Sequence, residues 1–388
     1  MKLKKIFNIA NVYILLWCFY FLQGAFYESG SIISRGILVV VLFISFYNFC
    51  VANIYYRLPI YFKGLNLLLV MFVIYWLILL GWGESRFFVP SSSDYIKPIL
   101  ISLLPIYSGY IYAKKWLVTN KTLTYWVPIW ILFVTILFYY TKEQYLLEIR
   151  GENKEMTNNV GYVILAIMPV MVIFRNKPLL FFAGIVYCML FIFMGMKRGA
   201  IFIGSLIFVY YLYFLYKKSI LKNKCLVVLF AFLSIIAVVN MVEYLLYSSS
   251  YFNLRLEQTL SGDSSGRDNI FSYFWNYFCN QDNGLNVLFG NGAFATIKLY
   301  SIFAHNDWLE ILICQGVIGF IIYFLYFYFL YRSWKRLKNN SIAYVGVGLI
   351  FLILILKTFI SMSYNDMPIF LSFSLGFFLA QSNVKAEV

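Results

Sequence analysis

The one histidine of the 388-residue chain, His305, stands in the segment AHNDWLEI, directly before a long apolar run. An imidazole has an ordinary pKa near neutrality, so it can accept a proton from a hydroxyl group at physiological pH. A lone histidine is more often structural than catalytic, but this one is followed by Asn306 and Asp307, with Glu310 close behind. We therefore predict that His305 acts as a general base and that Asn306 contacts the substrate. Asp307 and Glu310 are the competing bases.

Several basic residues are expected at the same membrane level as His305, near the ends of apolar runs. Charges close to or within membrane spans are costly, and they tend to mark functional sites or internal ion pairs. Arginine side chains also match phosphate oxygens in a bidentate way. These residues predict a cationic pocket for an anionic lipid head group, and they are Arg150, Lys197, Arg198, Arg267 and Lys357.

Each of these cations also has a plainer interpretation. Arg150 can pair with a neighbouring glutamate on a solvated loop, and Lys357 can extend its ammonium group to the membrane interface. Arg198 can contact an ordinary lipid phosphate, and Arg267 can be a surface charge of a helix. We favour binding roles for Arg198 and Arg267, because basic residues on the outer side of a membrane oppose the usual charge bias.

The composition, 62% hydrophobic and 12% charged residues, excludes a soluble globular domain, in which about a quarter of residues are charged. Apolar runs of about 20 residues recur, each long enough to cross a bilayer as a helix. We expect an all-α, polytopic membrane protein with nine spans in residues 1–246, a long outer loop in 247–303 and three spans in 304–388. The predicted spans are 6–26, 34–54, 65–82, 96–113, 122–141, 158–174, 179–196, 199–216, 225–246, 304–330, 341–361 and 368–382.

The net charge of +15 is explained by membrane topology. Basic residues favour the short cytoplasmic loops of membrane proteins. With the N-terminus in the cytoplasm, most basic residues fall in cytoplasmic segments beside a single acid, Glu387. We therefore expect both termini in the cytoplasm and no nucleic acid as a partner.

Two intervals on the outer side are long, residues 142–159 and residues 247–303. In the second, RDNIFSYFWNYF has apolar residues at helical spacing, which predicts a short amphipathic helix at the membrane surface. The segment LFGNGAF predicts a tight turn with a close approach of two backbones. AHNDWLEI supplies capping residues and then enters the tenth span.

The sequence offers no recognisable metal site or cofactor motif. The six cysteines lack the spacing of metal ligands or of a disulfide framework. There is also no DxD pair of the kind that holds a divalent metal on a diphosphate. A diphosphate substrate would therefore be neutralised by arginine and lysine. Aromatic residues of the loop form an interfacial belt or stack on sugar rings, and they are Trp275, Tyr277, Phe294 and Trp308.

The order of these motifs resembles the O-antigen polymerase and O-antigen ligase superfamily (Wzy and WaaL types). The resemblance covers about the second half of the chain, and the polymerase branch is the closer of the two. The motifs that show the resemblance are, in order, a KRGA turn, a long outer loop with SGR, FGNGAF, AHNDWLEILICQGVIGF and SMSYNDMPIF.

This resemblance implies a GT-C-like membrane glycosyltransferase that works without a metal on the periplasmic face of the bacterial inner membrane. Its donor would be a glycan linked to undecaprenyl pyrophosphate. His305 would be the general base, and Arg198 and Arg267 would grip the pyrophosphate, with Arg150 as a looser match. Membrane lipids, a chain-length regulator and a flippase are the other partners that it implies.

Three rival functions stay open. A ligase would use the same site to attach finished glycan to lipid A–core. A flippase or transporter would place ionisable groups near the bilayer midplane, often with inverted repeats, whereas the cations here are expected near one membrane face. A purely structural assembly partner would leave these cations without a role.

Overall fold

The computed structural model describes residues 8–26, 31–81, 90–148, 158–218, 224–248, 250–262 and 266–381. The regular structure within these ranges is helical, with no β-strand. The predicted all-α class is therefore confirmed. Helices dominate because a bilayer offers no water to the backbone, and a helix satisfies its own amide and carbonyl groups.

Seven helices in the described ranges are long and apolar enough to cross a membrane, and each coincides with a predicted span. Five shorter apolar helices coincide with the other predicted spans. The chain is thus a polytopic helical membrane protein, whereas the count of twelve spans stays a prediction. The seven are Ile32–Tyr55, Ile60–Gly81, Ser92–Lys114, Asn120–Thr141, Val228–Ser248, Asp307–Lys335 and Ser341–Ile360, and the shorter helices are Ile9–Leu22, Val160–Phe174, Pro178–Met194, Arg198–Phe214 and Ile369–Ala380.

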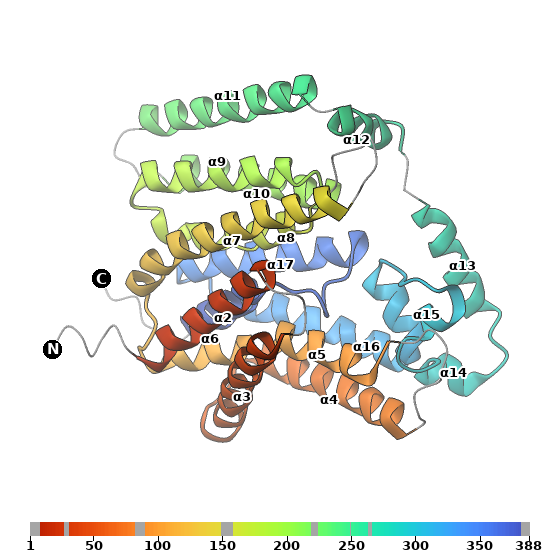
Figure 1. Ribbon diagram of the computed structural model, residues 1–388. Coiled ribbons are helices and arrows are strands. Elements are labelled where there is room, and N and C mark those ends of the chain that lie inside the picture. The colour runs from red at the N-terminus through yellow and green to blue at the C-terminus, as the bar shows by residue number, and fades with distance from the viewer. Residues whose placement is uncertain are drawn as a thin grey trace. The chain divides into compact units, whose positions relative to one another are not determined.

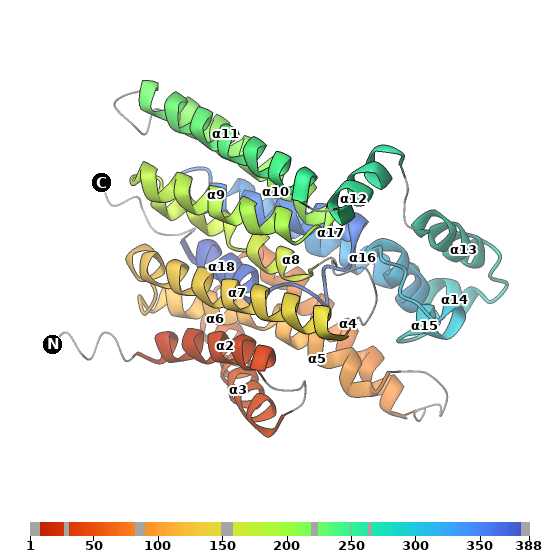
Figure 2. The ribbon, with the colours of Figure 1, turned by 45° about the horizontal axis from the view of Figure 1, so that its top comes forward.

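The chain forms two compact units, and the first comprises Met1–Ile44 and Tyr110–Gly262. Within it α9 packs against α8, η1, α10 and α11, and Figures 1 and 2 both show α11 running beside α9. Trp126 Nε1 donates to Asn11 Oδ1 at 2.9 Å, which joins α7 to α2. The helices of this unit are α2 (Ile9–Phe26), α7 (Asn120–Glu148), α8 (Val160–Leu165), η1 (Met168–Phe174), α9 (Pro178–Met194), α10 (Arg198–Lys218), α11 (Lys224–Ser248) and α12 (Ser250–Leu260).

The second unit comprises Ser45–Gly109 and Asp263–Val388. It contains His305 and the polar motifs of the second half of the sequence. Two helices, α3 (Ile32–Tyr55) and α6 (Pro105–Lys114), are divided between the units. The others are α4 (Ile60–Gly81), α5 (Ser92–Leu103), α13 (Arg267–Cys279), α14 (Gly284–Phe289), α15 (Ala295–Tyr300), α16 (Asp307–Lys335), α17 (Ser341–Ile360) and α18 (Ile369–Ala380).

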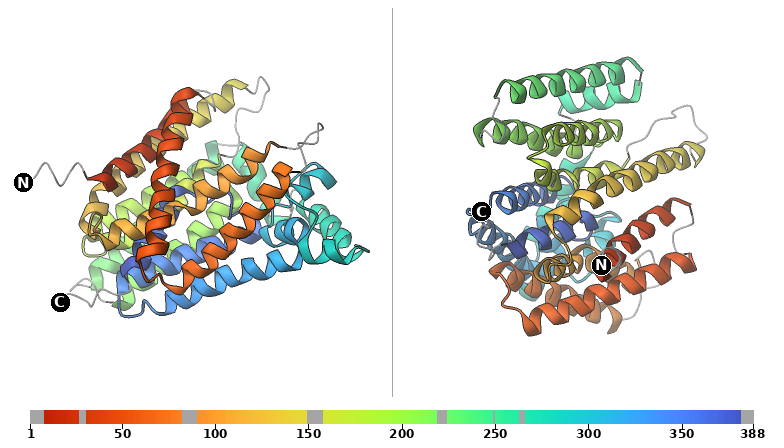
Figure 3. Two further views of the ribbon diagram at one scale, coloured as in Figure 1. Left: turned by 90° about the horizontal axis from the view of Figure 1, so that it is seen from below. Right: turned by 90° about the vertical axis from the view of Figure 1, so that its left-hand side faces the viewer.

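Helix α16 is the central element of the second unit. It packs against α4, α13, α14, α15 and α17, and Figure 3 shows it running alongside α4. Tyr61 of α4 donates from its backbone amide to Ser333 Oγ at 3.2 Å, and the Tyr61 and Tyr326 hydroxyls bond at 2.9 Å. These contacts fix the C-terminal half of α16, so its N-terminal end is presented by a rigid pair of helices.

The predicted outer loop, residues 247–303, contains the short helices α12, α13, α14 and α15. Short helices in this interval were expected from the sequence, and they are present. The division by topology into residues 1–246, 247–303 and 304–388 describes sides of a membrane. The two compact units are defined by internal contacts, so they do not test this division, which stays a prediction.

Candidate functional site

His305 lies directly before α16, at the entrance to the longest helix of the second unit. Asn306 is the N-cap of this helix, and its side-chain oxygen accepts from the Trp308 and Leu309 amides at 2.9 and 3.3 Å. Such a cap satisfies amide groups that have no partner within the helix. The predicted capping role of AHNDWLEI is confirmed, and contact between Asn306 and a substrate stays a prediction.

The backbone of His305 adopts a left-handed conformation with φ of 52°. L residues other than glycine rarely adopt this region, and such strain concentrates at functional sites. The hydrogen bonds at the start of α16 hold the chain immediately after this residue. The side chain of His305 is partly exposed, so the imidazole is accessible at the helix entrance.

The two carboxylates that compete with His305 are buried and occupied. Asp307 has an exposed fraction of 0%, and it accepts from the Tyr323 hydroxyl at 2.5 Å and from the Ser363 amide at 3.0 Å. Glu310 has an exposed fraction of 1%, and it accepts from Thr296 Oγ1 at 2.6 Å and from the Ala304 amide at 2.8 Å. Both side chains connect α16 to neighbouring segments and are buried, whereas His305 is partly exposed.

Another titratable neighbour, Tyr364, lies in the segment between α17 and α18. It is buried and stacks on Phe72, with ring centroids 5.0 Å apart. Burial raises the pKa of the Tyr364 phenol well above its ordinary value. A phenol that holds its proton so firmly is unsuited to act as a base at neutral pH.

The C-terminal end of α17 gathers several of the predicted cations and the start of α16. Arg267 Nη1 donates to the Ile360 carbonyl at 2.6 Å, and Trp308 Nε1 donates to Thr358 Oγ1 at 2.9 Å. Arg267 opens α13 and Trp308 opens α16, so both helix starts contact the same end of α17. The structure therefore brings Arg267 and the His305 segment to one end of the second unit.

Lys357 is buried at this end of α17 and has an acidic partner. Its ammonium group lies 2.8 Å from the Asp366 carboxylate and also donates to the Asp366 carbonyl. The side chain of Lys357 is 2% exposed, whereas that of Asp366 is 72% exposed. Sequence reasoning left an internal pair open but did not identify Asp366. The ion pair gives Lys357 a structural role, and its contact with substrate stays a prediction.

Helix α16 is broken at Gly316, which has φ of 69° and ψ of −167°. The break frees carbonyl groups, and the loop of FGNGAF binds them. The Asn291 amide donates to the Ile313 carbonyl at 2.9 Å, and the Gly292 amide donates to the Cys314 carbonyl at 3.0 Å. At Gly290 an added Cβ would collide with Cys314. The predicted tight turn with close backbone approach is confirmed, and its partner is the broken helix.

The predicted amphipathic helix is present as α13, but its apolar face packs against protein. Ile270 and Phe274 are buried against Ala304, Ile313 and Cys314, in a cluster that also contains Ala295. Sequence reasoning assigned this face to the membrane surface, because periodicity alone does not distinguish lipid from a neighbouring helix as the apolar partner.

The cations Lys197 and Arg198 lie in the first unit, where Arg198 begins α10. Both side chains are half-buried. The preceding turn is held in place, because the Asn158 amide donates to the Gly195 carbonyl at 2.8 Å and Asn158 Nδ2 donates to the Phe138 carbonyl at 3.2 Å. Arg150 lies outside the described residues. The joint action of Arg150, Lys197 or Arg198 with His305 stays a prediction.

The four loop aromatics differ in surroundings. Phe294 is buried, with its ring against Tyr95, and Trp308 packs among Phe320, Tyr323, Phe327 and Phe359. Trp275 is exposed. Tyr277 lines an open pocket, most of whose residues sequence reasoning missed: Tyr273, Asn276, Asn280, Gln281, Asp282 and Asn283. The signal was available, because residues 273, 276, 277 and 280 have the spacing of one helix face.

Comparison with protein-family models, with curated proteins and with solved structures finds no significant match. Within the described ranges, no three His, Cys, Asp or Glu side chains gather closely enough to hold a metal ion. The functional interpretation therefore depends on the motifs of the sequence and on the geometry of the second unit.

Proposed function

We propose that the chain is a metal-independent membrane glycosyltransferase of the O-antigen polymerase type. It transfers a growing glycan from undecaprenyl pyrophosphate onto the non-reducing end of a new lipid-linked repeat unit. The proposal places the protein in the bacterial inner membrane, with both termini in the cytoplasm and the site at the periplasmic face. A flippase would supply its lipid-linked substrate, and a chain-length regulator would be a partner.

The observation that carries this proposal is the contrast among the titratable side chains at the start of α16. Asp307 and Glu310 are buried and hydrogen-bonded, whereas the His305 imidazole is partly exposed on a strained backbone. A general base must reach the proton that it removes. Of these three residues, His305 is the one that is partly exposed.

In the proposed step a hydroxyl oxygen of the acceptor sugar attacks the anomeric carbon of the donor. The new C–O bond forms as the bond between that carbon and the pyrophosphate oxygen breaks, and the electron pair leaves with the pyrophosphate. His305 takes the hydroxyl proton. Because the leaving group is already activated, positioning and electrostatic stabilisation suffice for this chemistry.

Arg267 and Arg198 are proposed to stabilise the charge that develops on the leaving pyrophosphate. The Arg267 guanidinium carries five N–H donors, and Nη1 donates to the Ile360 carbonyl. That bond would fix the orientation of the group at the end of α17. The resemblance of the sequence motifs implies the same role for Arg198, with Lys197 and Arg150 as further cations. Lys357 would hold the segment that contains Asp366.

The direct test is His305→Asn, expressed in cells that lack the chromosomal copy of the gene. Asparagine tolerates a left-handed backbone, so this variant should insert and fold like the wild type while lacking a base. Since general base catalysis contributes roughly 100-fold or more, we expect only single repeat units on the surface glycan. The readout is a glycan ladder on a gel, beside a blot that confirms equal protein in the membrane.

A normal ladder from His305→Asn would refute the proposed role of His305. The same strains also test the alternatives. Accumulation of lipid-linked polymer with none on lipid A–core would indicate a ligase. Lipid-linked repeat units retained on the cytoplasmic side would indicate a flippase.

A further inference from the structure

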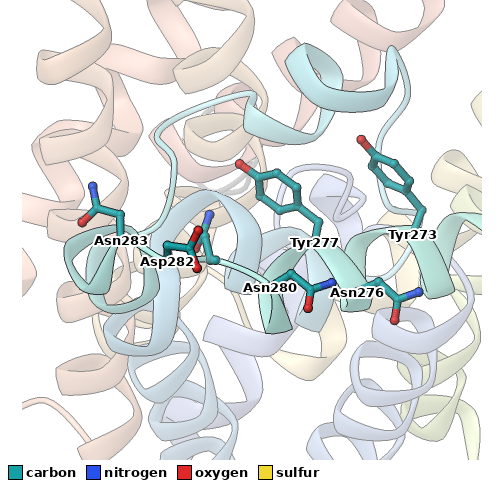
Figure 4. Close-up of a pocket in the computed structure, with 7 residues that line it drawn as sticks. Tyr273, Asn276, Tyr277, Asn280, Asp282 and Asn283 are labelled. Atoms are coloured by element: carbon teal, nitrogen blue, oxygen red, sulfur yellow. The ribbon is translucent and has the colours of Figure 1, made fainter.

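An open pocket of about 520 Å³ lies along α13 and the segment that leads into α14. Tyr273 and Tyr277 project from the same side of α13, and Asp282 and Asn283 lie beyond its C-terminal end (Figure 4). None of the pocket residues belongs to the proposed reaction site. They are Tyr273, Asn276, Tyr277, Asn280, Gln281, Asp282 and Asn283.

The chemistry of the pocket lining is specific. Two phenol rings, three asparagines and one glutamine contribute six of the seven side chains, and Asp282 is the one charged group. Each primary amide presents two N–H donors and a carbonyl acceptor, while a tyrosine ring presents an apolar face with a polar end. Among the described residues, no lysine, arginine or histidine lines the pocket. The lining therefore suits an uncharged, hydroxyl-rich ring molecule and does not suit a phosphate.

Three of the pocket-lining side chains are held by contacts with neighbouring residues. Tyr277 and Gln281 both donate to Asn291 Oδ1, at 3.4 and 2.8 Å. Asn291 in turn donates from its backbone amide to the Ile313 carbonyl of α16. Tyr273 packs against Tyr300, with ring centroids 4.5 Å apart. Two aromatic positions are therefore set before any ligand arrives, which lowers the entropic cost of binding.

One acceptor in the lining lacks a partner within the described part of the chain. Gln281 Oε1 is buried and accepts no hydrogen bond there, although Nε2 of the same side chain is bonded to Asn291. A buried polar atom without a partner is costly. A hydroxyl group of a bound molecule would provide the missing donor.

We infer that this pocket is a binding subsite for a neutral sugar of an oligosaccharide, with Tyr273 and Tyr277 against the sugar ring and the amides on its hydroxyl groups. The recognition follows from the lining itself. We take the oligosaccharide to be the repeat unit of the cell's own surface glycan, and this choice rests on the proposed function. The pocket would hold part of the glycan on residues other than those of the proposed reaction site.

The test uses the full-length protein in nanodiscs and, as the probe, oligosaccharide repeat units released by mild acid from the source cell's surface polysaccharide. Saturation-transfer difference NMR detects the bound sugar protons, and a titration gives the affinity. We expect binding by the wild type and a loss of about tenfold or more in Asn276→Ala/Asn280→Ala, since two hydrogen bonds are removed. Tyr273→Leu should weaken binding similarly.

Asn269→Ala is the matched control, because this residue is an exposed asparagine of the same helix outside the pocket. It should bind sugar like the wild type. Inorganic pyrophosphate, a second probe, should not compete with the oligosaccharide. Absence of sugar binding by the wild type, or equal binding by all pocket variants, would overturn the inference. Pocket variants that bind sugar normally but no longer copurify with a chain-length regulator would also overturn it, in favour of a protein contact.

Failure of the pocket and failure of the proposed function give different results. If His305→Asn abolishes chain extension while the pocket variants bind sugar normally, the pocket inference fails and the function stands. If the pocket variants lose sugar binding while the wild-type protein extends no chains, the function fails and the subsite stands.

Discussion

At the scale of single residues, the three titratable residues at the start of α16 differ in burial. His305 is partly exposed at the entrance of α16, while Asp307 and Glu310 are buried as hydrogen-bond acceptors. One partner of Asp307, the Ser363 amide, comes from the segment between α17 and α18. In our proposal His305 serves catalysis, whereas the observed hydrogen bonds give Asp307 and Glu310 structural roles.

Asp307→Asn should lower the stability of the folded protein and leave the proposed base, His305, in place. The Ser363 amide lies 3.0 Å from both carboxylate oxygens, so the NH2 group of asparagine would face this N–H donor in either orientation. A buried mismatch of this kind costs about 1–3 kcal/mol. A thermal unfolding scan of the detergent-solubilised protein should show a lower midpoint than the wild type.

Asp282→Asn provides the comparison, because Asp282 is exposed, and its unfolding midpoint should not change. If Asp307→Asn keeps the wild-type midpoint and yet loses all chain extension, Asp307 and not His305 would be the base.

The two halves of the Lys357–Asp366 pair should respond unequally to substitution. Asp366→Asn leaves a buried ammonium group with a weaker partner, whereas Lys357→Met leaves a carboxylate that is already 72% exposed. Breaking a buried pair costs about 3–5 kcal/mol when the remaining charge is buried. We therefore expect Asp366→Asn to lower the thermal midpoint more than Lys357→Met does, and the reverse order would contradict the burial of Lys357.

At the scale of elements, the break in α16 is the feature that organises the second unit. Gly316 interrupts the helix, and the FGNGAF loop supplies amides to the freed carbonyls of Ile313 and Cys314. Non-helical backbone within a membrane protein is tolerated where protein groups satisfy it. The same loop holds Asn291 behind the α13 pocket, so one turn supports two features.

Gly290 and Gly292 should differ in their tolerance of alanine. Both have positive φ, of 76° and 92°, but a Cβ at Gly290 would collide with Cys314, whereas open space surrounds Gly292. We expect Gly290→Ala to disrupt the packing of the loop on α16 and to lower the thermal midpoint strongly. Gly292→Ala should carry only the backbone strain, of about 1 kcal/mol.

Gly284→Ala is the control for this series, since no atom lies near its added Cβ and its φ is not positive. Equal destabilisation by Gly290→Ala and Gly292→Ala would show that the close approach of the loop to α16 is absent.

Features set by local sequence could be predicted, and features set by tertiary contacts could not. Long apolar runs, the Asn306 cap and the glycines of FGNGAF each determine structure through their own backbone. The partners of Asp307 and of the apolar face of α13 depend on which distant segments meet, and the pairing of Lys357 with Asp366 depends on how the chain turns after α17. The pocket-lining face of α13 is an intermediate case, because its spacing is visible in the sequence, whereas the pocket also needs the segment that leads into α14.

At the scale of the whole molecule, the chain is an all-helical membrane protein whose second unit contains His305, Arg267 and the α13 pocket. The first unit contains Lys197 and Arg198. The proposed orientation, which follows from the distribution of basic residues, assigns the α13 region to the periplasm and the start of α11 to the cytoplasm.

Two exposed native cysteines test this orientation. Cys279 lies at the end of α13, and Cys225 lies near the start of α11. A membrane-impermeant maleimide should label Cys279 in intact spheroplasts and should label Cys225 only after permeabilisation. The opposite pattern would reverse the topology and remove the periplasmic site, and Cys279→Ser identifies the labelled position.

The most direct test of the account is a reaction with purified components. Wild-type protein and His305→Asn in nanodiscs would each be incubated with synthetic lipid-linked repeat unit in the presence of a chelator, and the products sized by mass spectrometry. We predict a series of products that grow by whole repeat units with the wild type and none above background with His305→Asn. Equal product series from both proteins, or chain growth that requires an added divalent cation, would contradict the proposed mechanism.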